Sequence, residues 1–238
     1  MELFIERLSW TEVEAALAAG KRRAIVCAAS TEQHGPHLPE ATDELLGEAY
    51  AGGLAARLGD ALVAPVIRPA CSEHHMAFPG SLTISEELLM DIIDAYLASL
   101  RRHGFERFVL MSSHGGNFPV LARWQRERPA DDTVVLGDFQ VFEAGFEAIR
   151  RFGRTDNAGP HAEVLETSMM LYLHPDLVHM ERAVTGFTGE SSLDDVLRSG
   201  MRAITPNGIL GDPIGATAEM GVAVLDAIVE RLRQQIPA

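Results

Sequence analysis

The stretch RAIVCAASTEQHGPHLPEATD, residues 23–43, decides the fold. Its first seven residues, 23–29, are mostly apolar, which predicts a buried strand. A polar loop follows, stiffened by two prolines and a glycine, and a helical pattern begins at Asp43. A buried strand that runs through a loop into a helix is typical of the first half of a βαβ unit.

The same alternation continues along the chain. Further strands are predicted at residues 62–67, 107–112 and 133–138. Helical patterns cover residues 43–58, 85–103, 117–127, 139–151, 161–173 and 217–235. The sequence therefore predicts an α/β fold with a mainly parallel sheet and helices on both faces. Because repeats, low-complexity tracts and linkers are absent, we expect one domain over residues 1–238.

Composition excludes several classes of function. The 238 residues include 34 acidic and 20 basic side chains and carry a formal net charge of −14, which argues against a nucleic-acid partner. No apolar run reaches the roughly 18 residues of a membrane span, and Glu2, Glu6 and Arg7 interrupt any signal peptide. Two cysteines, Cys27 and Cys71, make no disulfide framework, so we expect a cytoplasmic protein.

Six of the nine histidines fall in four short segments at predicted strand ends or helix starts. These are His34, His37, His74, His75, His114 and His161. In the first segment, Glu32 and His34 project to the same side of an extended loop, and Asp43 opens the next helix. Such a set suits a divalent transition metal. The alternative is a polar surface loop in which Asp43 only complements the helix dipole.

His114 ends the predicted strand at 107–112, and Gly115 and Gly116 follow it. The two glycines let backbone N–H groups approach a ligand, so this segment can serve a metal, an oxyanion or both. The alternative is a tight turn with an incidental histidine. A serine hydrolase is not expected, because the Gly-x-Ser-x-Gly motif is absent.

The two other segments are less specific. After the strand at 62–67 come Ser72, His74 and His75, then a Phe78-Pro79-Gly80 corner that suits the wall of a site. The histidine pair either reaches the site or belongs to a polar loop.

The fourth segment begins with His161 and opens a predicted helix. Glu163 and Glu166 would share one face of that helix. Acids in a first turn also simply complement the helix dipole, so the segment leaves open which glutamate has a function.

Together the four segments resemble the creatininase (creatinine amidohydrolase) family. The matching motifs are residues 32–39 with 42–43, 72–81, 114–117 and 161–168, and a C-terminal match at 211–213 and 216–219. The resemblance implies a three-layer α/β/α sandwich with a mostly parallel central sheet. It also implies a hydrolytic centre with two divalent ions, and a homo-oligomer, frequently a hexamer built as a trimer of dimers.

Carried over by position, the resemblance implies that Glu32, Asp43 and His114 hold one metal ion. His34 and Asp43 would hold the other, with Glu166 completing the second site. Asp43 would then bridge the two ions.

The implied activity is hydrolysis of a C–N bond in a small amide, cyclic amide or formamide by a metal-activated water. His161 matches the family's proton-transfer histidine, and N–H groups of Gly115 or Gly116 would help to stabilise the oxyanion. Substrate contacts are expected from Ser72, His74, His75 and Phe78. The metals would be Zn or Mn, with Fe also compatible. The alternative is a non-catalytic metal- or ligand-binding member of the family.

The chain departs from the family pattern at several positions. Creatininase itself carries Tyr-Glu where Gly115-Gly116 stands, and that glutamate is a metal ligand there. The Gly-Gly form is that of other branches, including peptidases of peptide-cofactor maturation. The family usually has Glu-His at His74-His75, and tryptophan is absent after Trp124. We therefore expect the metal-binding motif to be kept and creatinine not to be the substrate.

Overall fold

A sheet of four parallel strands, in the order β2-β1-β3-β4, forms the centre of the computed structural model. The structure describes residues 1–128, 130–154, 161–189 and 192–237. The strands are β1 (Arg23–Ala28), β2 (Ala61–Val63), β3 (Arg107–Ser112) and β4 (Thr133–Leu136). Because β1 and β3 pair along their whole length, with Ala28 opposite Ser112, the loops that follow them leave the sheet side by side.

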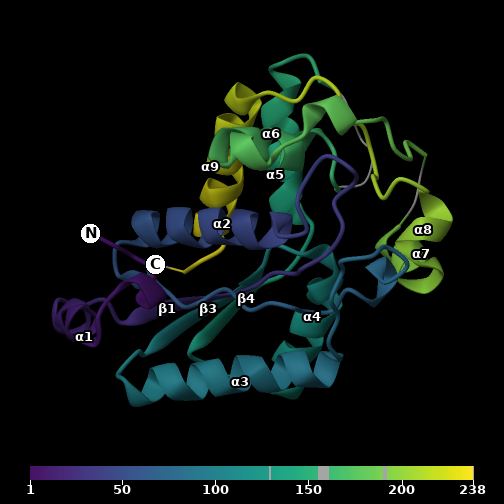
Figure 1. Cartoon of the computed structure of the whole chain (residues 1–238). Helices are drawn as coiled ribbons and strands as arrows, with labels where there is room; N and C mark the ends of the chain where they lie inside the picture. Colours follow the sequence, from purple (N-terminus) through teal and green to yellow (C-terminus); the bar gives the residue numbers. More distant parts are fainter. Residues whose placement is uncertain (129, 155–160, 190–191, 238) are drawn as a thin grey trace.

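Helices cover both faces of the sheet. The helices of the described residues are α1 (Trp10–Ala18), α2 (Thr42–Leu58), α3 (Glu86–Arg102), α4 (Phe118–Glu127), α5 (Gln140–Arg150), α6 (Val164–Leu173), α7 (Leu193–Ser199), α8 (Met201–Ile204) and α9 (Ala218–Gln234). In Figure 1, α2, α5, α6 and α9 lie above the sheet, and α3 and α4 lie below it. Alternate side chains of β1 enter the two cores, Ile25 and Cys27 on one face and Ala24 and Val26 on the other. The predicted three-layer α/β/α sandwich is confirmed.

Local chemistry sets the helix ends that were predicted. The Ser85 hydroxyl accepts a hydrogen bond from the Leu88 N–H and caps α3. Gly59 follows α2 with φ of +77°, a left-handed conformation that glycine adopts without strain.

Two predicted strands were too long. β2 ends at Val63, not at residue 67, because Pro65 has no N–H to donate to a ladder. The chain returns to the sheet only at Ile67, which forms an isolated bridge with Ala28. β4 ends at Leu136 rather than at residue 138.

The helix predicted at 161–173 begins three residues later, at Val164. His161 instead forms a bridge with Leu210, and Ala162 has φ of +57°. Glu163 is therefore the N-cap residue of α6, and its carboxylate accepts a hydrogen bond from Leu165 N–H. The prediction that Glu163 and Glu166 share one helical face was wrong.

The short helices α7 and α8 were not predicted from the sequence. They lie apart from the two helical layers, at the right of Figure 1, and pack against η2 (Glu73–His75). α7 also contacts η3 (Gly115–Asn117). The other 3₁₀ turns are η1 (Ile5–Arg7), η4 (Pro175–Leu177) and η5 (Met180–Arg182). Within the described ranges, no helix is both long enough and apolar enough to cross a bilayer.

Candidate metal centre

The loops that follow β1, β2 and β3 converge at one edge of the sheet, as expected for parallel strands. Asn117 ties them together. Its amide nitrogen donates to the carbonyls of Ala28 and Ala29, at 3.3 and 3.0 Å, and its oxygen accepts from the Cys71 N–H at 3.2 Å. One buried side chain thus holds together the loops that carry the candidate ligands.

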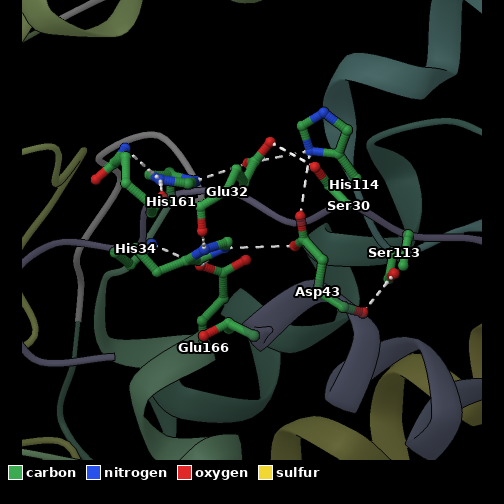
Figure 2. A network of polar contacts seen from close by, with 12 residues as sticks. Ser30, Glu32, His34, Asp43, Ser113, His114, His161 and Glu166 are labelled. Carbon is green, nitrogen blue, oxygen red and sulfur yellow. Dashed lines mark hydrogen bonds and ion pairs between the residues drawn. The ribbon is translucent and has the colours of Figure 1, made fainter. Parts of the chain in front are cut away.

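The first group of ligands surrounds His114. Its Nδ1 lies 3.2 Å from Glu32 Oε1 and 3.4 Å from Asp43 Oδ2 (Figure 2). Its Nε2 lies 3.1 Å from the carbonyl oxygen of Cys71 and donates to it. A metal-binding histidine is commonly oriented in this way, because a bond at one ring nitrogen leaves the other free to coordinate.

The second group surrounds His34. Its Nε2 lies 3.4 Å from Asp43 Oδ1 and 3.7 Å from Glu166 Oε2. Its Nδ1 donates to the carbonyl of Glu32 at 3.0 Å, so this imidazole is also oriented by the backbone. The two oxygens of Asp43 thus face different histidines, as Figure 2 shows.

Neighbouring groups orient the carboxylates. The Ser30 hydroxyl donates to Glu32 Oε2 at 3.0 Å and shares a hydrogen bond with Ser72. Ser72, a predicted substrate contact, is not among the residues that line the cavity. Through Ser30 it helps to orient the carboxylate of Glu32. The N–H of Ala162 donates to Glu166 Oε2, and the left-handed backbone at Ala162 accompanies this contact.

The chemistry of this donor set fits a divalent metal. Glu32, Asp43 and Glu166 are at most 5% exposed. Among the described protein atoms, Glu32 Oε1, His34 Nε2 and Asp43 Oδ2 are buried without a hydrogen-bond partner. Such atoms are costly unless an ion compensates them. The groups His34–Asp43–Glu166 and Glu32–His74–His114 each bring three ligand atoms within 4.8 Å of one another.

The pKa shifts of His34, Glu166 and His114 also indicate that the buried carboxylates favour a nearby positive charge. Burial lowers the pKa of His34, but the carboxylates of Asp43 and Glu166 outweigh it and raise this pKa to about 10. Burial, with Asp43 close by, raises the pKa of Glu166 to about 7. The pKa of His114 lies well above its usual value, because Glu32 and Asp43 outweigh the burial of its ring. The carboxylates therefore favour a positive charge on or beside these two imidazoles.

A network around Gln33 sets the tautomers of two further histidines. His161 Nε2 donates to the carbonyl of Gln33 at 2.8 Å, which leaves Nδ1 with a lone pair 3.9 Å from Glu32 Oε1. The Gln33 amide donates to His75 Nδ1 at 3.0 Å and to the Gly208 carbonyl at 3.1 Å. His75 then carries its proton on Nε2, 3.3 Å from Glu32 Oε1. Burial keeps the pKa of both histidines well below its usual value.

A cavity of about 250 Å³ opens onto these ligands. The part of its lining that comes from the ligand segments, called the inner part, comprises Glu32, Asp43, His74, His75, Ser113, His114, Gly115, Gly116, His161 and Glu166. The rest of the lining, called the outer part, comprises Phe139, Phe142, Ser192, Leu193, Val196, Met201 and Leu210. The residues of α7 and α8 that line the cavity, and the role of Gln33 in orienting the histidines, were not predicted from the sequence. For Gln33 the only available signal was its place inside the first motif.

The predicted substrate contacts divide into two groups. His74 and His75 line the cavity, and the ring of His74 stacks on that of His114, with centroids 5.5 Å apart. Phe78 instead packs into a small cluster with Val196 and Met201, behind the cavity wall. It supports the wall and does not face the ligands.

Comparison with known proteins is decisive for the family. The family model described as creatininase, creatinine amidohydrolase, matches residues 6–236. The chain belongs to the creatininase family. Among family members, it is 33% identical over 219 residues to the mycofactocin precursor peptide peptidase of Mycolicibacterium smegmatis, covering 89% of this chain and 83% of the relative. It is 29% identical to the creatinine amidohydrolase of Pseudomonas putida, covering 99% and 98%.

Solved creatininase structures have the same fold. A creatininase variant of the Zn-Zn type superimposes with a TM-score of 0.82 at 29% identity, over 100% of both chains. A structure described as creatininase Mn gives a TM-score of 0.78 at 28% identity, also over 100% of both. With its buried clusters of metal-ligand side chains, the chain is a creatininase-family metal-dependent hydrolase.

Proposed function

We propose that this creatininase-family hydrolase is a dinuclear amidohydrolase. Its substrate is a small amide, cyclic amide, formamide or short peptide, whose C–N bond it cleaves. The observation that carries the proposal is the placement of Asp43, whose two oxygens lie 3.4 Å from His34 Nε2 and 3.4 Å from His114 Nδ1. Glu32, Asp43 and His114 would hold one ion, and His34, Asp43 and Glu166 the other.

The metals are proposed to be Zn or Mn, with Fe as a further candidate. Mixed carboxylate and imidazole ligands suit all three, and the similar structures described as Zn-Zn and Mn favour the first two. Bound divalent ions supply an activated water and a Lewis acid for the amide carbonyl.

The residues of the chain then handle protons and charge. His161 Nδ1 holds a lone pair toward the centre, so it is suited to accept the proton of the attacking water and deliver it to the leaving nitrogen. N–H groups of Gly115 or Gly116, which line the cavity, are proposed to donate to the oxyanion. The Gln33 network keeps His161 in the tautomer that this role requires.

Gly116 stands where creatininase itself has a metal-binding glutamate, so the ligand sets of the two sites are expected to differ. A Cβ at this position would lie 2.3 Å from His114 Nε2 and 2.8 Å from the Cys71 carbonyl oxygen. A glutamate at 116 is therefore incompatible with this arrangement of His114, and Glu166 is proposed to supply the carboxylate instead. Together with the higher identity to the peptide peptidase than to creatininase, this favours a peptide or open-chain amide over creatinine.

An amide panel tests the proposal. Metal-free protein, restored with Zn²⁺ or Mn²⁺, is assayed on N-formyl amines, N-acyl amino acids, lactams and dipeptides. We expect at least one class to be hydrolysed only after metal is restored. The His161→Asn variant should keep its metal and lose turnover. If the metal-loaded wild type binds amides without hydrolysing any class, the protein is a non-catalytic metal-binding member of the family.

Three further properties are proposed on the family resemblance and composition. They are a single domain over residues 1–238, a cytoplasmic location, and a homo-oligomer, in the form of a hexamer built from three dimers. Light scattering coupled to size-exclusion chromatography measures the last of these directly, and a monomer would contradict it.

A further inference from the structure

The outer part of the cavity has a different chemistry from the metal centre. Among the described residues of this outer part, every side chain is apolar except that of Ser192. The Ser192 hydroxyl is already engaged, because it donates to the Asp195 carboxylate and accepts from the Asp195 N–H to cap α7. Ser113, farther in, donates to the backbone carbonyl of Asp43.

The described side chains of this outer part are also uncharged. Among the described residues that line the cavity, no lysine or arginine is present. A substrate carboxylate would meet aromatic and aliphatic surface here and would lose its hydration without a cationic partner. Transfer of an uncharged apolar group from water to the same place would be favourable.

Helices α7 and α8 form one wall of the cavity, the α7–α8 roof. Leu193 and Val196, three residues apart on α7, face the cavity, and Met201 of α8 adds to them. Val196 and Met201 also belong to a small apolar cluster with Leu210, packed by Phe78 from behind. Neighbouring Leu197 is 37% exposed and lines a different hollow beside α3.

The size of the cavity limits what the wall can hold. At about 250 Å³ it lies below the roughly 300 Å³ at which pockets for drug-sized ligands begin. Since the scissile amide must occupy the inner part, the outer part has room for one side chain. Phe139 and Phe142 offer that side chain two aromatic rings, with centroids 6.1 Å apart.

We propose that the substrate carries one uncharged aliphatic or aromatic group beside the scissile amide, held by Phe139, Phe142 and the α7–α8 roof. This inference rests on the proposed function, because it places the amide at the metal centre. The roof would then select substrates by the apolar area that they bury, in addition to the amide chemistry that the centre performs.

Acyl hydroxamates test this selection without requiring turnover, because a hydroxamate head chelates a metal while its acyl chain probes the wall. Calorimetry on the metal-restored protein measures Kd for acetohydroxamate, butanohydroxamate, pentanohydroxamate and the monohydroxamate of succinic acid. We expect affinity to rise about fourfold per methylene until the cavity is filled. The succinate probe, which matches pentanohydroxamate in length, should bind at least tenfold more weakly than it.

Equal affinities along the series would overturn the apolar subsite and leave the proposed metal centre intact. If no hydroxamate binds the metal-restored protein, the proposed centre fails and the subsite fails with it.

Two adjacent positions of α7 give a matched pair of variants. Val196→Asp should weaken pentanohydroxamate at least tenfold and leave acetohydroxamate unchanged. Leu197→Asp, which introduces the same charge one residue along the helix, should alter neither affinity. Val196→Thr keeps the shape of the side chain and should weaken the longer probe less, so it serves if the aspartate variant does not fold. Unchanged selectivity in a folded, metal-loaded Val196 variant contradicts the assignment.

Discussion

Asp43 is the residue that the two proposed ligand groups share, so its replacement should affect both metal ions. The perturbation is Asp43→Asn, which keeps the shape of the side chain and removes its charge. Each oxygen of Asp43 lies 3.4 Å from a histidine nitrogen, His34 Nε2 or His114 Nδ1, so an ion bound by either imidazole would lie about as close to the carboxylate. At that separation, and with an effective dielectric of roughly 20, each pair of unit charges interacts by about 5 kcal/mol.

The lower desolvation cost of an amide offsets part of this loss. The net effect should still be at least about 3 kcal/mol, or roughly a hundredfold in metal affinity. Because Asp43 faces both ligand groups, both ions should be weakened together. The assay is metal content by mass spectrometry after dialysis, with affinity measured by competition against a fluorescent chelator, and with circular dichroism as the check on folding.

Glu44 provides the matched control. It is the next acid in the first turn of α2, but its carboxylate pairs with Arg68, which is partly exposed. If Asp43 only complemented the helix dipole, Glu44→Gln and Asp43→Asn would have similar small effects. We expect Glu44→Gln to keep wild-type metal affinity. A folded Asp43→Asn protein that retains two tightly bound ions would refute the bridging role.

Three other predictions follow from the same geometry. His161→Asn should keep both metals and lower kcat by roughly 10²- to 10⁴-fold; loss of metal together with kcat would make His161 a ligand instead. Gly116→Ala should destabilise the protein and weaken metal binding, because its Cβ would lie 2.3 Å from His114 Nε2. Gly115→Ala should be tolerated, because the nearest atom to its Cβ would be 3.1 Å away. Thermal denaturation and metal content of the two variants check both expectations. The pKa of His34 is raised to about 10, so the contribution of its charge to stability is full below pH 6.5 and is lost as pH rises through 10. The melting temperature of the metal-free protein should therefore fall between pH 7 and pH 10. A rise in melting temperature over that range would contradict a protonated His34.

The sheet and the first ligand segment could be predicted because their signals are local. The apolar run at 23–29 and the polar loop after it follow one another in the chain, and a parallel sheet brings such loops to one edge. Capping at Ser85 and the left-handed Gly59 likewise depend on near neighbours only.

Features that depend on distant contacts were not predictable in this way. The start of α6 is delayed because His161 pairs with Leu210, almost fifty residues later, and nothing in the local pattern indicates that bridge. The α7–α8 roof consists of helices too short for a clear period, and its apolar residues pack against segments distant in sequence, including η2, η3 and Leu210. Phe78 is apolar and near the site in sequence, but it packs behind the wall because Val196 and Met201 stand in front of it.

In the proposed metal centre, one chain holds two divalent ions bridged by a single carboxylate. The most direct measurement is elemental analysis of wild-type protein that has been stripped, restored with Zn²⁺ or Mn²⁺ and separated from free metal. We expect two ions per chain in the wild type and a joint loss of both in Asp43→Asn. One ion per chain in the wild type, or loss of only one in the variant, would contradict it.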